Sequence, residues 1–188
     1  LKGTIYYSPL ESLRQKGQAV LPACEAAVDM LYFKTVWKIK EKYLSGQEKK
    51  DLTQCFGTRM DMLNLQWICR AKKYYHLPEG EIYAMIIPIS LHLKKTEIRA
   101  MAQAEDVEQV YALIRNSWYG RLDLGNLEKG QSLEEPCREV IDRIYELTSR
   151  KEPYSASVLN SYLYFKEREI EKIITTIERI RYGVAAGI

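Results

Sequence analysis

Residues 51–75 read DLTQCFGTRMDMLNLQWICRAKKYY, and this stretch decides the fold. Its large apolar residues recur at helical spacing and predict one long amphipathic helix; they are Leu52, Phe56, Leu63 and Trp67. Four polar residues interrupt this pattern, namely Arg59, Asp61, Asn64 and Arg70. Because a buried polar group costs free energy unless it is hydrogen-bonded, we expect these side chains to satisfy one another or a neighbouring helix. The stretch therefore predicts a polar network that fixes how the helices pack.

The rest of the chain also carries helix signals, and strand signals are almost absent. Capping boxes, prolines and apolar periodicity predict helices over residues 8–18, 24–44, 79–86, 96–103, 107–117, 132–149 and 157–182. The glycine-rich residues 119–131 are expected to form a linker, and residues 89–93 have a short extended pattern. The last helix is expected to carry a continuous aliphatic face formed by Ile170, Ile173, Ile174, Ile177 and Ile180. We therefore expect an all-α fold.

The composition is that of a globular protein, with 46% hydrophobic residues, 28% charged residues and a formal net charge of +3. No block of like charges marks a nucleic-acid arm or a lipid-binding segment. The longest apolar run, residues 83–87, ends at Pro88 and is far shorter than the ~20 residues that span a bilayer. Any membrane role is therefore expected to be peripheral. Four cysteines without a CxxC pair predict reduced thiols in a cytosolic protein.

Motifs for catalysis or cofactor binding are absent from the sequence. It contains no glycine-lysine phosphate loop, no GxGxxG, no GxSxG and no metal-ligand cluster, and His76 and His92 stand apart from cysteines. We therefore expect neither an enzyme nor a bound metal or cofactor. Basic residues next to tyrosines at 70–75 are an ingredient of single-strand binding, but the nearly neutral charge makes a nucleic-acid binder the less favoured alternative.

Two parts of the chain resemble each other. Residues 28–32, VDMLY, match residues 141–145, IDRIY, and further along Phe56, Asp61, Leu65, Lys73 and Tyr74 align with Tyr164, Glu169, Ile173, Arg181 and Tyr182. The alignment requires a turn about five residues shorter in the second hairpin, and turns tolerate such changes. Two duplicated helical hairpins are one interpretation, with Glu169 at the place of Asp61. Chance similarity of amphipathic helices is the other.

Several of these motifs, taken in order, resemble a known family. They are Tyr32-Phe33, Arg59-x-Asp61-x-x-Asn64-Leu65, Arg70-Ala71-Lys72-Lys73, Ile87-Pro88 and Lys166-Glu167-x-Glu169-Ile170. Their order and spacing, from about residue 25 to residue 182, are similar to the C subunit of archaeal and bacterial V-type ATP synthases and its eukaryotic counterpart, the d subunit of vacuolar ATPases. Lys172 stands where the family usually has asparagine, and Ile89-Ser90 replaces its usual glycine.

The resemblance implies a fold of three helical repeats that form a funnel. Residues 1–23 would then be the end of a preceding repeat, residues 24–129 the middle repeat and residues 130–188 the last one. Because the chain begins with Leu1 and not with methionine, we expect it to be a fragment of a longer protein.

The same resemblance implies a non-catalytic subunit, without a cofactor, that seats the rotating central stalk on the membrane proteolipid ring. Such a subunit is peripheral, on the cytoplasmic side of the membrane. The residues at the family's patterned positions are candidates for partner contact or for internal polar pinning: Arg59, Asp61, Asn64, Arg70, Lys72, Lys73, Tyr74 and Glu169. A polar network inside the protein favours pinning for Asp61 and Asn64, whereas Lys72, Lys73 and Tyr74 are the better contact candidates. A helical-repeat adaptor outside any ATPase is the main alternative function.

Overall fold

The computed structural model describes residues 2–17, 20–122, 124, 132–151 and 153–183. These residues form helices and connecting segments without a strand, so the all-α prediction is confirmed for them. The helices are α1 (Tyr7–Gln15), α2 (Leu21–Tyr43), α3 (Gly46–Arg70), α4 (Glu79–Met85), α5 (Lys95–Gln103), α6 (Val107–Asn116), α7 (Glu134–Ser149) and α8 (Ala156–Arg181). A π-helical turn at Ala71–Tyr75 continues α3, and a 3₁₀ turn at Trp118–Arg121 follows α6.

Some predicted boundaries are wrong. The central helix α3 begins at Gly46 and not at residue 51, and α1 ends at Gln15. Residues 89–93 form no strand; this segment follows α4 irregularly and leads into α5. Part of the predicted linker is ordered, because residues 118–121 form a 3₁₀ turn and Leu124 is buried. Residues 123 and 125–131 of that linker lie outside the described residues.

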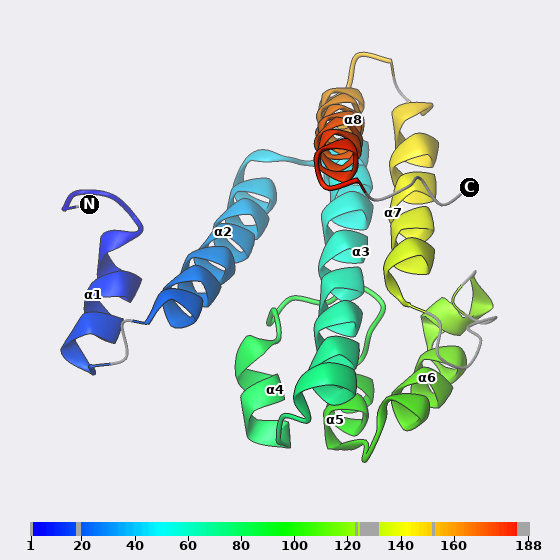
Figure 1. The fold of residues 1–188 in the computed structure, drawn as a ribbon. Helices are drawn as coiled ribbons and strands as arrows, with labels where there is room; N and C mark the ends of the chain where they lie inside the picture. Colours follow the sequence, from blue (N-terminus) through cyan, green and yellow to red (C-terminus); the bar gives the residue numbers. More distant parts are fainter. Residues whose placement is uncertain (1, 18–19, 123, 125–131, 152, 184–188) are drawn as a thin grey trace.

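The main core surrounds the second half of α3. Figure 1 shows α4, α5 and α6 gathered around that end of α3, with α7 alongside and α1 and α2 set to one side. Buried residues from five helices meet there, including Met62, Leu65, Ile68, Ile82, Met101, Val110, Ile114 and Val140. No residue of α1 is buried. The body of the protein is therefore a cluster built on α3.

A smaller cluster joins α3, α7 and α8. It consists of Cys55, Tyr145 and Tyr164, and the two tyrosine rings stack with centroids 4.1 Å apart. The Tyr164 hydroxyl donates a hydrogen bond to Asp142 Oδ1 at 2.6 Å, and the Ser161 hydroxyl donates one to the Tyr145 carbonyl at 3.1 Å. This cluster holds the first half of α8 against α7 and α3.

Asp61 fixes the irregular segment that covers α3. Its carboxylate is fully buried and accepts hydrogen bonds from the backbone N–H groups of Leu91, His92 and Leu93 at 2.8–3.3 Å. The Tyr119 hydroxyl donates a further bond to Asp61 Oδ2 at 2.7 Å. Burial raises the pKa of the Asp61 carboxyl above its ordinary value, although the hydrogen bonds from His92 and Tyr119 act in the opposite direction.

Asn64 holds the same segment three residues further along α3. Its side-chain amide donates to the Ile87 carbonyl at 3.1 Å, and its oxygen accepts from the Ile87 N–H at 2.8 Å. Asp61 and Asn64 therefore do not bond to the arginines of α3, which was one of the two alternatives expected from the sequence. Their partners are mainly backbone groups, because the segment next to Pro88 has no regular secondary structure in which to pair its own N–H and C=O groups.

We expect the Asp61→Asn substitution to lower the free energy of unfolding by roughly 1–3 kcal/mol, because an amide group then faces buried N–H donors that need an acceptor. The matched control is Glu169→Gln, the same chemical change at the aligned position of α8, where the side chain is exposed. Urea unfolding followed by circular dichroism measures both. Equal losses in the two variants would contradict the assignment of Asp61 as an internal pin.

Gly57 gives a second test of how residues 86–93 pack on α3. A Cβ atom added at Gly57 would lie 2.7 Å from Leu91 Cβ, whereas one added at Gly80 in α4 meets nothing within 4 Å. Glycine in a helix is ordinarily less stable than alanine by roughly 0.5–1 kcal/mol. We therefore expect Gly80→Ala to stabilise the protein and Gly57→Ala to destabilise it. Thermal melting of the two variants checks this, and stabilisation by both would refute the close contact.

Candidate functional site

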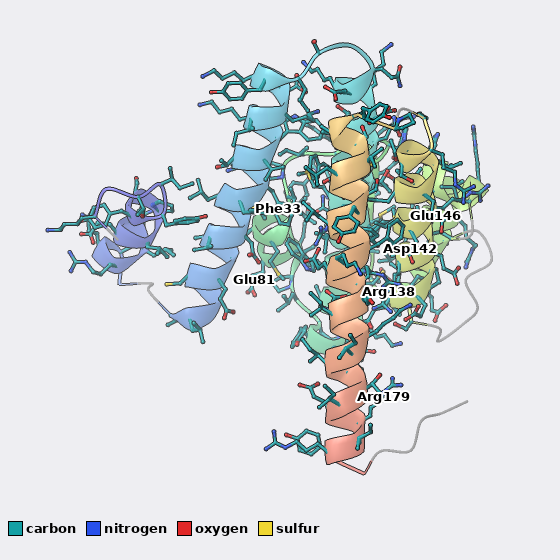
Figure 2. The ribbon with its side chains drawn as sticks, turned by 90° about the horizontal axis from the view of Figure 1, so that it is seen from above. Phe33, Glu81, Arg138, Asp142, Glu146 and Arg179 are labelled. Atoms are coloured by element: carbon teal, nitrogen blue, oxygen red, sulfur yellow. The ribbon has the colours of Figure 1, made fainter. Side chains whose placement is uncertain are left out.

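A polar groove runs between α3, α7 and α8. It is lined by Arg59, Gln66, Arg70, Glu134, Arg138, Ile141, Tyr164, Glu167, Arg168 and Glu171, and it encloses about 190 Å³. Figure 2 shows Arg138 and Asp142 on the part of α7 next to α8. We call this surface the arginine groove, because four arginines from three helices line it.

The arginine groove brings together two of the predicted residues, Arg59 and Arg70. They are eleven positions apart, which is three helical turns, so both lie on the same side of α3. Arg59 Nη1 lies 3.5 Å from Glu167 Oε2 of α8, and Arg70 pairs with Glu134 of α7. The arginines therefore bridge α3 to the two other helices and are not part of the Asp61 network.

The other residues that line the groove were not among the candidate site residues predicted from the sequence. Arg168 donates to Asp142 Oδ2 at 3.0 Å, and the same carboxylate accepts the Tyr164 hydroxyl. Burial and the hydrogen bond to Asp142 raise the pKa of Tyr164 above its ordinary range. Helical spacing was the signal in the sequence that could have identified these residues. Arg138 and Asp142 on α7 are four residues apart, as are Tyr164 and Arg168 on α8, so each pair lies on one face of its helix.

The end of α3 adds further predicted residues beside the groove. Lys73 and Tyr74 line a small adjoining pocket together with Arg70, and Lys73 Nζ lies 5.4 Å from the Tyr74 ring centroid. The Tyr74 ring is exposed. Lys72 lies on the same π-helical turn but lines neither the pocket nor the groove.

Glu169 lies apart from the other candidates. It is exposed on α8 and accepts a hydrogen bond from Lys166 Nζ at 2.6 Å, which holds the pKa of its carboxyl below the ordinary value. It contributes neither to the groove nor to the pinned segment. The aligned positions Asp61 and Glu169 thus have different surroundings in the two hairpins.

The chemistry of the arginine groove suits contact with another protein. Its four arginines are accompanied by three glutamates, so it lacks the excess of positive charge that a nucleic-acid backbone requires. The ion pairs of Arg59 and Arg70 are partly exposed and worth roughly 0–1 kcal/mol each, so charges on a partner can replace them at little cost. Within the described ranges, no three His, Cys, Asp or Glu side chains are placed to hold a metal ion.

Among the described residues, no helix is both long enough and apolar enough to cross a bilayer. The four cysteines, all within the described residues, are free thiols, and three of them are buried.

Comparison with known proteins identifies relatives of one kind. The C subunit of the A-type ATP synthase from Pyrococcus abyssi is 28% identical over 98% of this chain and 50% of its own length. The C subunits of the A-type ATP synthases from Pyrococcus furiosus and Methanobrevibacter smithii are 26% and 24% identical, over 96% and 95% of this chain and 49% of their own lengths. The chain therefore spans about half the length of the curated relatives it matches. No solved structure gives a significant match.

A family model provides the broadest match. The model described as ATP synthase (C/AC39) subunit matches residues 1–187, almost the whole chain. The order of motifs, the all-α fold of the described residues and this match agree, and the chain belongs to the ATP synthase (C/AC39) subunit family.

Proposed function

We propose that the protein is a non-catalytic coupling subunit of a V-type rotary ATPase or ATP synthase, which joins the central rotor stalk to the membrane proteolipid ring during ion transport. In this role it binds no cofactor and is peripheral to the membrane, on its cytoplasmic side. The observation that carries the proposal is the family match over residues 1–187. The name that the relatives share, as C subunits of A-type ATP synthases, supports it.

The proposal includes the repeat organisation. Residues 24–129 form the middle repeat and residues 130–188 the last one, each built on a pair of long helices, while residues 1–23 end a preceding repeat. The pairs are α2 with α3 and α7 with α8, which pack on each other in sequence order. The length of the relatives, about twice that of this chain, is consistent with a further repeat in the parent protein.

Transmission of torque requires a body that does not deform, and the Asp61 and Asn64 bonds supply one source of stiffness. They connect α3 to the segment before α5 through hydrogen bonds with distances of 2.8–3.3 Å, and the Tyr119 hydroxyl after α6 donates a buried bond to Asp61 at 2.7 Å. A buried network in which each polar group has a partner permits few alternative arrangements. These two residues therefore act inside the subunit, and partner contact falls to exposed side chains.

The contact residues proposed for the rotor stalk are those of the arginine groove and the adjoining end of α3. Arg59, Arg70, Lys73 and Tyr74 combine guanidinium and ammonium groups with an exposed aromatic ring. Arginine and tyrosine are enriched at protein interfaces, where both supply large contact area and directed hydrogen bonds. Lys72 extends this surface along the same turn.

The test is binding of the full-length parent protein, and separately of this 188-residue chain, to purified central-stalk subunits and to the detergent-solubilised proteolipid ring. We expect saturable binding of the parent to both. Arg70→Glu should weaken binding to the stalk roughly tenfold, about 1.4 kcal/mol, because it reverses a charge in the contact surface.

The matched control is Arg99→Glu, the same charge reversal at an exposed position of α5 away from the groove. It should leave both affinities unchanged. If the full-length protein bound neither stalk nor ring, the coupling role would be refuted and the helical adaptor would become the better interpretation. Equal effects of the two reversals would remove the arginine groove from the interface.

A further inference from the structure

A separate pocket lies between α4 and α5, which pack on each other beside the second half of α3 (Figure 1). The end of α4, the irregular segment and the start of α5 form this pocket, and it encloses about 260 Å³. Most of its lining is apolar and consists of Tyr83, Ile86, Ile87, Pro88 and Ile98. We call it the α4–α5 pocket. It shares no residue with the arginine groove.

The network on α3 fixes the most buried part of the α4–α5 pocket. Ile87 and Ile98 are only 1% and 5% exposed. Both backbone polar groups of Ile87 are bonded to the Asn64 side chain, and the ring of Pro88 restricts the backbone at the next residue. The chain's own contacts therefore hold the pocket open, so a ligand does not have to order the segment in order to bind.

Two polar side chains, Ser90 and Lys95, complete the lining. Lys95 is exposed, and its ammonium group forms no hydrogen bond or ion pair with another described residue. The same is true of the Ser90 hydroxyl. Both groups can donate hydrogen bonds, and the ammonium carries a full positive charge. The pocket thus places two free donors next to an apolar surface.

The carboxylates of α4 do not neutralise Lys95. None of them lines the pocket. Glu79 lies 3.9 Å from Arg99 Nε, with which it forms an ion pair. Glu81 is two residues from Tyr83 and therefore points to nearly the opposite side of α4.

The charges of α5 leave the same balance. Glu97 accepts a hydrogen bond from the backbone N–H of Lys94 at 2.7 Å and does not line the pocket. Lys94 and Arg99 do not line it either. Lys95 is therefore the one charged group in the lining, and an anion complements it.

We propose that the α4–α5 pocket binds an apolar carboxylate. The apolar part lies against Ile87 and Ile98, and the carboxylate accepts hydrogen bonds from Lys95 and from the Ser90 hydroxyl. The volume is just below the roughly 300–1,000 Å³ of typical ligand pockets, which limits the apolar part to one ring or a short chain. A phosphate fits less well, because phosphate sites favour several donors and bidentate arginines. The site lies outside the proposed stalk contact and does not depend on the coupling role.

NMR titration of the 188-residue chain with phenylbutyrate tests the proposal. We expect saturable shifts of the methyl signals of Ile86, Ile87 and Ile98, with a dissociation constant of roughly millimolar order for so small a ligand. The uncharged phenylbutanamide should bind roughly threefold more weakly, because it lacks the ion pair with Lys95. The cationic phenylbutylamine should bind more weakly still.

Lys95→Gln should remove the preference for the acid and leave the affinity for the amide unchanged. Lys38→Gln is the matched control, the same change at an exposed position of α2, and it should keep the preference. Tyr83→Ala should weaken the acid and the amide alike by roughly twofold or more, because it removes apolar contact from the rim. Tyr83 and both lysines are exposed, so the variants are expected to fold, and unchanged methyl signals of Met62 and Val140 in the main core verify it.

Two further ligands distinguish the sources of such a carboxylate. N-acetyl-Asp-Phe-amide presents it within a peptide chain, and N-acetyl-Asn-Phe-amide is its uncharged match. Tighter binding of the acidic peptide than of phenylbutyrate would assign the pocket to a segment of a partner protein, and the reverse order to a free acid. The proposal is overturned if neither acid gives saturable shifts at these isoleucines, if the amide or the amine binds as tightly as the acid, or if Lys95→Gln keeps the preference.

Discussion

The architecture depends on hydrogen bonds from α3 to the irregular segment between α4 and α5. That segment contains Pro88 and lies over α3, so its N–H and C=O groups lose water without gaining helix or sheet partners. Asp61 supplies a carboxylate for three successive N–H groups, and Asn64 supplies a donor and an acceptor for Ile87. With the segment held there, α4, α5 and α6 can cover the apolar side of α3 and complete the main core.

The long helices α3 and α8 differ in the burial of their aligned residues. On α3 the residues Met62, Leu65 and Cys69 are buried, while the aligned residues of α8 are Ile170, Ile173 and Ile177, all exposed. At the aligned polar positions α8 has Glu169 and Lys172, both in water. The described residues contain no irregular segment over α8 that needs their hydrogen bonds. On α8, therefore, both the apolar residues and the aligned polar residues are exposed.

Much of the fold was predictable from the sequence, because the signals that identify a helix lie within the helix itself or at its ends. Periodicity and prolines identify α2, α3 and α8, and the Asp106 side chain caps α6 as its capping box indicates. Polar residues inside an apolar face also marked Asp61 and Asn64 as unusual. Their partners could not be predicted, because backbone groups some 20 to 30 residues away have no side-chain signature. The arginine groove was missed for a related reason, since its four arginines converge only when α3, α7 and α8 pack.

The buried pins and the surface charges differ in how easily they rearrange. Breaking the Asp61 contacts leaves several donors without water, whereas Arg59 and Arg70 can exchange Glu167 and Glu134 for solvent or for a partner's carboxylate with little change in free energy. The same chain thus has a fixed interior and an adaptable exterior. The proposed coupling role, in which a subunit holds its shape under load while it binds other proteins, would require both properties. The burial of each carboxylate decides whether its contacts are fixed or adaptable. Asp61 is fully buried among N–H groups, and Glu167 remains half exposed to water.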